Sequence, residues 1–518
     1  MGSAPPMGLD ELCRDLGGGR VGRWRNVTVT GLTTDSRRTR PGDLFVAVAG
    51  ETAHGAAFAA DALARGAVAV VGAPGAPLPG GVPALVHPRP EVILAELAAR
   101  LYRRPARQLT VIGVTGTNGK TTTALMAAAM LRHSGRPTSH WTTTEVAVGR
   151  ERFRPYWTTP PPPDLHRFLR AAVDAGSTHV VMEVSSHGIA LNRLQGVRFA
   201  AGAVTNVTAD HLDFHGDLAA YVATKRAFVE QLDADATAVL GADDPVAAGF
   251  ARHLRARPVT FGTASDATLQ ACRIDPRSTR LRFELRIRGL APQVLTVDLG
   301  MPGRHNALNA MAALALAGAV GVPPALARDA LAAFEPPPRR IETRSVGPYT
   351  MVNDVAMNEG SCDAVLQAVA DLAPAQLVVV QAVRGHRGPE VSRAIARVLA
   401  RWAPRLGFGP LVVSLSRAHL ARAAVDHAVR TAELDALLGQ CAILGLDTQV
   451  HAELDDAIRA AADRLEEGGT LLLLGTFGMD DGPRLATALL ARRAGVDPGT
   501  LPAYLSPSYG GDEGGSGP

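Results

Sequence analysis

The stretch TVIGVTGTNGKTT, residues 110–122, decides the fold of the chain. Its first five residues are an apolar run typical of a buried strand, and a helix-forming segment follows from Lys120 to His133 and ends before Gly135. Between them, the glycines of GTNGKTT (116–122) allow backbone N–H groups to converge on phosphates, and the amino end of the helix adds positive charge. We therefore predict an α/β nucleotide-binding domain in which Lys120 reaches the terminal phosphates.

The predicted phosphate loop departs from the strict P-loop pattern. That pattern requires glycine at position 114, where the chain has Val114, and Gly113 lies one residue too early. A glycine turn in an α/β domain that binds no nucleotide is therefore the alternative interpretation. The flanking strand and helix favour the phosphate site, whose predicted nucleotide-binding residues are Gly116, Thr117, Asn118, Gly119, Lys120, Thr121 and Thr122.

Lysine is used very sparingly. Of 53 basic residues, only Lys120 and Lys225 are lysine, and the other 51 are arginine. Arginine keeps its proton in proteins, whereas the lysine amine can become a neutral nucleophile. Two positions where a guanidinium cannot substitute would explain the pattern, and codon bias towards arginine with two accidental survivors is the alternative.

The chain divides into three predicted domains. Its 518 residues exceed what one hydrophobic core usually spans. Apolar strands such as THVVMEV (178–184) and LVVVQAV (377–383) alternate with helical stretches, which predicts mostly parallel sheets. We place an N-terminal domain at 1–107, a central P-loop domain with a mostly parallel sheet at 108–338, a Rossmann-like domain at 339–496 and a disordered tail at 497–518.

Composition excludes several other classes of protein. No run approaches the ~18 apolar residues of a membrane helix, and the first residues do not resemble a secretory signal. The four cysteines lack metal spacing and suit a reducing cytoplasm, where we expect the protein to be located. The net charge of +4 is small and no basic run is interleaved with aromatics, so nucleic acid is a poor candidate partner.

Six motifs then carry a resemblance to a known family. They occur in one order along the chain: TGTNGKTT (115–122), MEVSSHG (182–188), TNVTADHLDFHG (205–216), YVATKRAF (221–228), GADDP (241–245) and PGRHNALNA (302–310). This order resembles the Mur ligase superfamily. The resemblance implies a three-domain α/β enzyme that uses ATP to join a carboxylate to an amine through an acyl-phosphate, with release of ADP and phosphate.

The resemblance also implies the catalytic residues. Lys120 would bind ATP, Glu183 and His211 would bind Mg²⁺ together with Thr121, and Lys225 would carry a CO₂-derived carbamate that holds one of two Mg²⁺ ions. A core role for His211 and an exposed helical role for Lys225 are the alternatives. Asn306, Arg340 and Asp354 match further nucleotide positions.

The first domain narrows the resemblance. The segment TTDSRRTRPGDLFVAVAG (33–50) is similar to the uridine-binding domain of UDP-N-acetylmuramoyl-L-alanyl-D-glutamate ligases, the tripeptide synthetases. This similarity implies that Ser36 and Arg37 bind uridine diphosphate. The implied further contacts to the nucleotide-sugar are Thr158, Thr159, Ser185 and Arg193. A surface turn of serine and arginine with no ligand is the alternative.

The third domain departs from the family pattern. An Asp-Tyr-Ala-His-Asn-Pro segment is replaced by DVAMNE (354–359), and the Asp-Asn-Pro-Arg signature for diaminopimelate is absent, with Arg417 in that region. GTFGM (475–479) replaces the closing Gly-Lys-Gly-His-Glu segment. We therefore expect a divergent ligase acting on small molecules, a carboxylate donor such as a nucleotide-sugar and an unidentified amine. An ordinary tripeptide synthetase and a catalytically idle scaffold are the alternative functions. We expect the protein to be a monomer, and an oligomer is the alternative.

Overall fold

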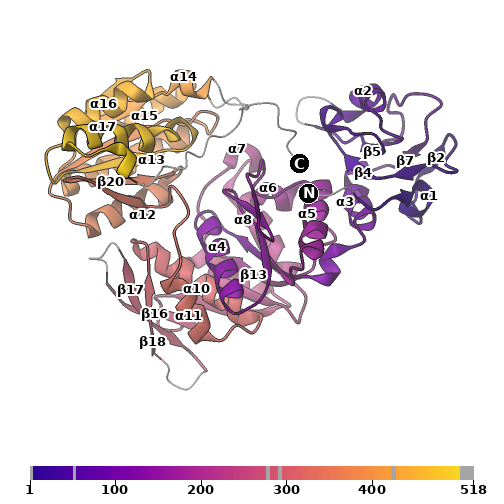
Figure 1. Ribbon diagram of the computed structural model, residues 1–518, viewed down its shortest axis with the longest axis horizontal. Coiled ribbons are helices and arrows are strands. Elements are labelled where there is room, and N and C mark those ends of the chain that lie inside the picture. Colours follow the sequence, from indigo (N-terminus) through magenta and orange to yellow (C-terminus); the bar gives the residue numbers. More distant parts are fainter. Residues whose placement is uncertain (1–3, 51–53, 276–279, 290–293, 422–427, 502–518) are drawn as a thin grey trace.

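The chain folds into three lobes (Figure 1). The computed structural model describes residues 4–50, 54–275, 280–289, 294–421 and 428–501. Most of the predicted disordered tail, 502–518, lies outside these residues, and its start contains the short 3₁₀ helix η6 (Pro498–Thr500). Among the described residues, no helix combines the length and the apolar character needed to cross a bilayer.

The N-terminal lobe is built on a five-stranded sheet. The order of its strands is β2 (Gly19–Val21), β7 (Ala84–Val86), β6 (Ala69–Gly72), β5 (Asp43–Val46) and β4 (Gly31–Thr33). Strands β4 to β7 run parallel, which requires crossovers such as the one through α2 (Ala59–Ala64). Helix α3 (Pro90–Leu101) packs its apolar face on this sheet and leads into the central lobe.

The central lobe contains an eleven-stranded sheet. Seven strands run parallel in its middle: β9 (Thr138–Trp141), β12 (His179–Glu183), β8 (Thr110–Thr115), β13 (Phe199–Val204), β14 (Thr237–Gly241), β15 (Arg257–Gly262) and β16 (Leu269–Asp275). Antiparallel strands extend both ends: β10 (Val146–Val148) and β11 (Glu151–Phe153) at one, β17 (Leu281–Ile287) and β18 (Val294–Leu299) at the other.

Helices cover both faces of the central sheet because successive strand residues point to opposite sides. Ile112 of β8 packs with α4 (Lys120–His133), α10 (Arg304–Ala319) and α11 (Pro324–Ala332). Val111, the preceding residue, packs with α5 (Pro162–Asp174) and α8 (Leu218–Glu230) on the other face. The continuous apolar run of β8 is thus explained by burial on both sides.

The third lobe carries a six-stranded sheet. Its order is β19 (Glu342–Val346), β20 (Tyr349–Asp354), β24 (Thr470–Leu474), β21 (Leu377–Ala382), β22 (Leu411–Ser414) and β23 (Thr448–His451), and only β19 is antiparallel. One face packs on α12 (Glu359–Asp371), α13 (Pro389–Leu406) and α15 (Thr431–Ile443), and the other on α16 (Leu454–Arg464) and α17 (Gly482–Ala494). Carboxyl ends of parallel strands share one edge, so loops after β20, β21 and β24 meet there.

Candidate active site

The phosphate loop joins β8 to α4, and its backbone requires glycine at two positions. Gly116 and Gly119 have positive φ angles of 147° and 86°. A Cβ at Gly116 would lie 1.8 Å from Thr205 Oγ1, and one at Gly119 would lie 2.2 Å from Asn309 Oδ1. No L side chain fits either position, so the glycines let the loop approach its neighbours closely.

The loop is hydrogen-bonded to the segment that follows β13. The Thr117 N–H donates to the Asn206 carbonyl at 2.9 Å, and the Asn118 N–H donates to Asn206 Oδ1 at 2.9 Å. The Thr117 hydroxyl donates to the Thr208 carbonyl at 3.0 Å. These contacts fix the conformation of the loop, which is the pre-organisation that a phosphate-binding loop needs.

The side chains of the two lysines meet at one backbone carbonyl of this loop. Lys120 Nζ donates to the Gly116 carbonyl at 3.0 Å, and Lys225 Nζ, which comes from α8, donates to the same oxygen at 2.9 Å. Lys225 is buried, and its Nζ lies 4.7 Å from the centre of the Tyr221 ring. Burial, and then the charge of Lys120, lower the pKa of Lys225 well below its ordinary value, so burial favours the neutral amine.

Glu183 ends β12 next to the start of α4. Its carboxylate accepts from Thr121 Oγ1 at 2.8 Å, from the Thr143 N–H at 2.6 Å and from Thr143 Oγ1 at 3.0 Å. The side chain is fully buried, and these donors are all neutral. A carboxylate and a hydroxyl oxygen side by side fit Mg²⁺, which prefers oxygen ligands and leaves its other positions to water and phosphate.

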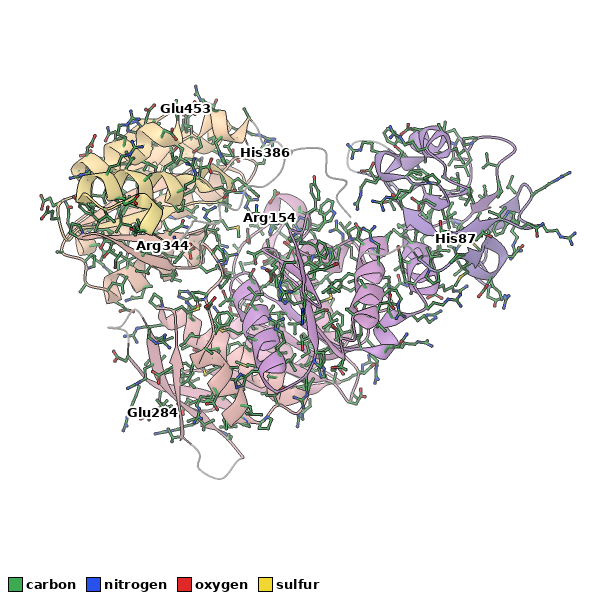
Figure 2. All side chains as sticks on the ribbon, in the orientation of Figure 1. His87, Arg154, Glu284, Arg344, His386 and Glu453 are labelled. Carbon is green, nitrogen blue, oxygen red and sulfur yellow. The ribbon has the colours of Figure 1, made fainter. Side chains whose placement is uncertain are left out.

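His211 lies at the boundary with the third lobe. Its φ of 53° is left-handed, and its Nδ1 is 2.9 Å from Arg387 Nη1. Arg387 Nη2 donates to the buried Asp210 carboxylate at 2.7 Å. Burial, and then the charge of Arg387, lower the pKa of His211 to about 2, so the imidazole is neutral and its one free ring nitrogen accepts the hydrogen bond from Arg387. Figure 2 shows His386, the residue before Arg387, on the side of the third lobe that faces the central one.

The expected metal ligands are not assembled into one protein-only cluster. Among the described residues, no three His, Cys, Asp or Glu side chains come together as a metal-binding group. Thr121 and Glu183 are in contact, whereas His211 is engaged by Arg387. A metal held here would therefore need oxygens from a nucleotide, which is how Mg²⁺ is usually bound in phosphate-transfer enzymes.

The residues of the central lobe that are expected to bind the nucleotide-sugar form a hydrogen-bonded group beside Glu183. Thr159 Oγ1 donates to the Glu183 carbonyl at 2.9 Å and accepts from the Ser185 N–H at 2.9 Å. Arg193 Nη1 donates to the Thr159 carbonyl at 2.8 Å, and its guanidinium lies 4.9 Å from the Trp157 ring centre. The neighbouring hydroxyl of Thr158 accepts from Thr143 Oγ1 at 3.1 Å.

The two residues of the N-terminal lobe that are expected to bind uridine diphosphate, Ser36 and Arg37, differ in their exposure to solvent. Ser36 is buried at the start of η1 (Ser36–Arg38), whereas the side chain of Arg37 is 82% exposed and pairs with Asp35 at 2.8 Å. The next residue, Arg38, forms an ion pair with Asp164 of α5 at 3.2 Å. This ion pair connects the first lobe to the central one.

Three family models match the chain in order. They are described as Mur ligase family, catalytic domain, over residues 28–102, Mur ligase middle domain over 114–317, and Mur ligase, glutamate ligase domain, over 339–477. A UDP-N-acetylmuramoyl-L-alanyl-D-glutamate–2,6-diaminopimelate ligase of Chelativorans sp. (strain BNC1) is 36% identical over 462 residues, which cover 86% of this chain and 89% of the relative. The chain belongs to the Mur ligase family.

Solved structures of Mur ligases share the fold. MurF from Acinetobacter baumannii has a TM-score of 0.72 at 18% identity and covers 94% of this chain and 99% of its own. MurF from Thermotoga maritima in complex with ADP has a TM-score of 0.65 at 19% identity and covers 90% and 98%. The predicted three-domain α/β architecture is confirmed, and so is the predicted class, an ATP-dependent, ADP-forming amide ligase.

In this Mur ligase, two other predicted nucleotide-site residues are buried near the phosphate loop. Asn306 donates to the Pro302 carbonyl at 2.7 Å and accepts from Asn309 Nδ2 at 3.0 Å. Asn309 is the side chain that Gly119 approaches. Thr122 is buried in the first turn of α4. Asn306 therefore supports the loop through Asn309.

Asp354 and Arg340 lie where the third lobe begins. The buried Asp354 carboxylate accepts from the N–H groups of Ile341 and Ala356, both at 2.8 Å. Burial raises the pKa of Asp354, and the charge of Arg340 opposes this. Asp354 thereby fixes the segment that carries the half-buried Arg340. Burial lowers the pKa of Lys120, and the charge of Arg340 lowers it further, so Arg340 lies close to that lysine.

Arg417 does not share this site. It begins α14 (Arg417–Leu420) and lines a cavity of about 490 Å³ together with Thr431 and Leu434. None of the described residues that line this cavity is one of the predicted nucleotide or metal residues.

Several residues of the site were not singled out from the sequence. Asp210, Thr143, Asn358 and Arg387 contact the predicted residues directly. Asp210 precedes His211 within a quoted motif, so adjacency was an available signal. Arg387 and Asn358 come from the divergent third domain, and only the fold brings them to the phosphate loop.

Proposed function

We propose that this Mur ligase joins the carboxylate of a UDP-muramoyl-type donor to an amine through an acyl-phosphate, with release of ADP and phosphate. The observation that carries the proposal is the meeting of Lys120 and Lys225 at the Gly116 carbonyl, next to the contact between Thr121 and Glu183. A buried amine beside a phosphate loop suits carbamate formation, since CO₂ reacts with the neutral amine. The contacts of Glu183 suit Mg²⁺.

The proposed roles follow from charge and position. Lys120 would neutralise the terminal phosphates of ATP, Thr121 and Glu183 would hold one Mg²⁺, and a carbamate on Lys225 together with His211 would hold a second. Mg²⁺ held by these residues would supply positive charge that offsets the phosphates during transfer of the terminal phosphoryl group from ATP to the donor carboxylate. The amine then displaces phosphate, and Lys120 stabilises the negative charge that develops on the acyl oxygen.

We also propose the donor side of the site. Ser36, Arg37, Thr158, Thr159, Ser185 and Arg193 would bind the nucleotide-sugar. The name of the Chelativorans relative, a UDP-N-acetylmuramoyl-L-alanyl-D-glutamate–2,6-diaminopimelate ligase, supports a donor of this type. The contact between Arg193 and the Trp157 ring supplies both a charge and an apolar surface for such a ligand.

The proposed domain division at 1–107, 108–338 and 339–496 is supported by the three large sheets, each of which lies within one segment.

The amine is the part of the reaction that differs most from the family pattern, because the third domain lacks the diaminopimelate signature. An ordinary tripeptide synthetase with unusual third-domain contacts is the second candidate function, favoured by the diaminopimelate ligases among the relatives.

The proposal is tested with full-length protein, ATP, Mg²⁺ and UDP-muramoyl-dipeptide against a panel of amines, by ADP release and product mass. Donor-dependent ADP release and a ligated product are expected, and Glu183→Ala is the matched inactive control. Growth rescue of a strain lacking the tripeptide synthetase would favour the second candidate. If ATP is not hydrolysed with any donor and amine, the proposed ligase activity is wrong, and the catalytically idle scaffold remains as the interpretation.

A further inference from the structure

The amine of Lys225 has fewer hydrogen-bond acceptors around it than an ammonium group needs. An ammonium carries three hydrogens, and the bond to the Gly116 carbonyl at 2.9 Å is the one hydrogen bond that Nζ makes to the described residues. The side chain is only 1% exposed. Unused donors on a buried charge cost free energy, so the site suits a form of Lys225 with fewer hydrogens on its nitrogen.

His215 shares its surroundings with Lys225. It ends α7 (Leu212–His215), the short helix that precedes α8 in the central lobe (Figure 1). The centre of its ring is 5.2 Å from the centre of the Tyr221 ring, and Lys225 Nζ lies 4.7 Å from that same ring centre. Burial, and then the charge of Lys225, lower the pKa of His215, so the two side chains are close enough to interact.

The Nε2 atom of His215 is buried and has no hydrogen-bond partner in the part of the chain that the structure describes. The ring itself is held in place. Its centre lies 4.9 Å from that of Phe214 and 5.9 Å from that of His187, and the backbone N–H of His215 donates to the His211 carbonyl at 3.0 Å. A fixed ring with an unused buried nitrogen points to a polar group that the nitrogen contacts.

A second unpartnered atom lies on the strand against which α8 packs. Thr115 Oγ1 is buried and makes no hydrogen bond to the described residues. Thr115 shares one face of β8 with Gly113, where an added Cβ would lie 2.6 Å from Phe228 Cζ of α8. Lys225 lies one turn before Phe228 on this helix. It bonds to the carbonyl of Gly116, the residue that follows Thr115, so Thr115 faces the amine end of Lys225.

We propose that Thr115 and His215 are positioning residues for a carbamate on Lys225, whose two oxygens accept hydrogen bonds from Thr115 Oγ1 and His215 Nε2. This inference rests on the proposed function. The lone pair of the neutral amine forms a bond to the carbon of CO₂, one C–O π pair moves onto oxygen, and one N–H proton leaves to solvent. The single hydrogen that stays on nitrogen matches the single acceptor, the Gly116 carbonyl. The Thr115 hydroxyl, and His215 in the tautomer with hydrogen on Nε2, are the donors that the new anion needs.

The test measures the carbamate directly, by ¹³C NMR of full-length protein in labelled bicarbonate over a range of CO₂ concentrations. Thr115→Val and His215→Phe keep the volume and the ring contacts and remove only unpartnered polar atoms, so the fold should be retained in thermal unfolding. We expect each variant to raise the CO₂ concentration for half-occupancy of Lys225 about tenfold. His253→Phe, at an exposed position of η4 (Phe250–His253), is the matched control and should leave that concentration unchanged.

Two further readouts separate a positioning role from a structural one. His215→Gln carries an amide N–H to about the place of Nε2 and should restore most of the carbamate that His215→Phe loses. Ligation by His215→Phe should be slow at ambient CO₂ and should approach the wild-type kcat as bicarbonate is raised, because excess CO₂ refills a weakened site by mass action. A folding defect would not respond to CO₂.

The possible failures are distinguishable. If wild-type protein forms no carbamate, with or without Mg²⁺ and ADP, the proposed role of Lys225 is wrong and the inference falls with it. If wild type forms a carbamate and both Thr115→Val and His215→Phe take up CO₂ equally well, the inference alone is overturned, and a bound water rather than the carbamate satisfies the two atoms. Ligation by His215→Phe that stays slow at saturating bicarbonate contradicts the assignment of His215.

Discussion

The side-chain amides of Asn118 and Asn358 donate to each other, at 3.1 Å in both directions, although 240 residues separate them in the chain. Asn118 belongs to the phosphate loop, and Asn358 caps the amino end of α12 by accepting from the Ser361 N–H at 2.9 Å. A second bond runs from Asn358 Nδ2 to Asp210 at 3.3 Å. The phosphate loop and the third domain are therefore connected through one side chain.

Asn358 variants test this connection. Asn358→Ala loses the helix cap and should lower the free energy of unfolding by about 1–2 kcal/mol, measured by urea titration. Asn358→Asp keeps the cap but has no N–H for Asn118 and places a second carboxylate beside Asp210. We expect it to raise the KM for ATP about tenfold, measured by ADP release. An aspartate variant with the wild-type KM would show that the amide pair does not influence the nucleotide site.

The sequence predicts the parts of the site that are local in the chain. The helix expected from Lys120 to His133 is α4 with those same ends, and the expected strand LVVVQAV (377–383) forms β21. The expected strand THVVMEV (178–184) forms β12, which ends at Glu183. These features follow from periodicity and turn residues, which act over a few positions.

Contacts between distant segments could not be predicted in this way. The bond from Arg387 to Asp210 joins residues 177 positions apart, and it depends on how the third domain sits against the second. The antiparallel strand β17 was a different omission. Its residues LRFELRI alternate between buried and more exposed positions, and this period of two in the sequence indicates a strand with one buried face.

Lys225→Arg should abolish ligation while the fold is retained, because a guanidinium cannot form a carbamate. Lys225→Ala should also be inactive, but short carboxylates such as acetate should restore part of its activity by replacing the missing anion. ADP release with donor and amine measures both variants, and ¹³C NMR of wild-type enzyme in labelled bicarbonate should show a carbamate carbon. Full activity of the arginine variant would refute the carbamate role.

The lowered pKa of Lys225 also predicts how stability depends on pH. Between that lowered pKa and the ordinary value of 10.5, the unfolded chain binds the proton that the folded chain has lost, so stability rises with pH across this window. Lys225→Met keeps the volume without the proton. In CO₂-free buffer, the free energy of unfolding of the wild type should rise relative to that of the Met variant by up to about 1.4 kcal/mol per pH unit as the pH approaches 10.5 from below. A pH-independent difference in urea unfolding would mean that Lys225 stays protonated when buried.

The phosphate-loop glycines allow a matched test of backbone geometry. Gly116→Ala and Gly119→Ala force a Cβ against Thr205 and Asn309 at positive φ, so each should destabilise the protein by more than about 1 kcal/mol and weaken ATP binding. Gly439→Ala, in the interior of α15 with nothing within 4 Å of the added Cβ, should instead stabilise it by about 0.5–1 kcal/mol. Similar effects at all three positions in thermal unfolding and nucleotide titration would argue against a special loop geometry.

The ion pair between Arg387 and Asp210 predicts a strong thermodynamic coupling between domains. Both side chains are at least nine-tenths buried, and although burial opposes ionisation of Asp210, the charge of Arg387 keeps the pKa of this carboxylate below its ordinary value. Arg387→Met leaves the carboxylate buried without its partner and should cost about 3–5 kcal/mol of stability. Asp210→Asn in that background removes the stranded charge and should recover much of the loss.

The coupling is measured by a double-mutant cycle in urea, on nucleotide-free protein, with Arg387→Met, Asp210→Asn and the double variant. We expect the double variant to be more stable than the sum of the single effects by about 1–3 kcal/mol. Arg198→Met, which breaks an exposed pair with Asp233 and Asp235, serves as the control and should leave unfolding nearly unchanged. Additive effects of the two buried substitutions would mean that Asp210 is stabilised by its other neighbours, Asn358 and His211, and that Arg387 is free to leave it whenever the third domain moves.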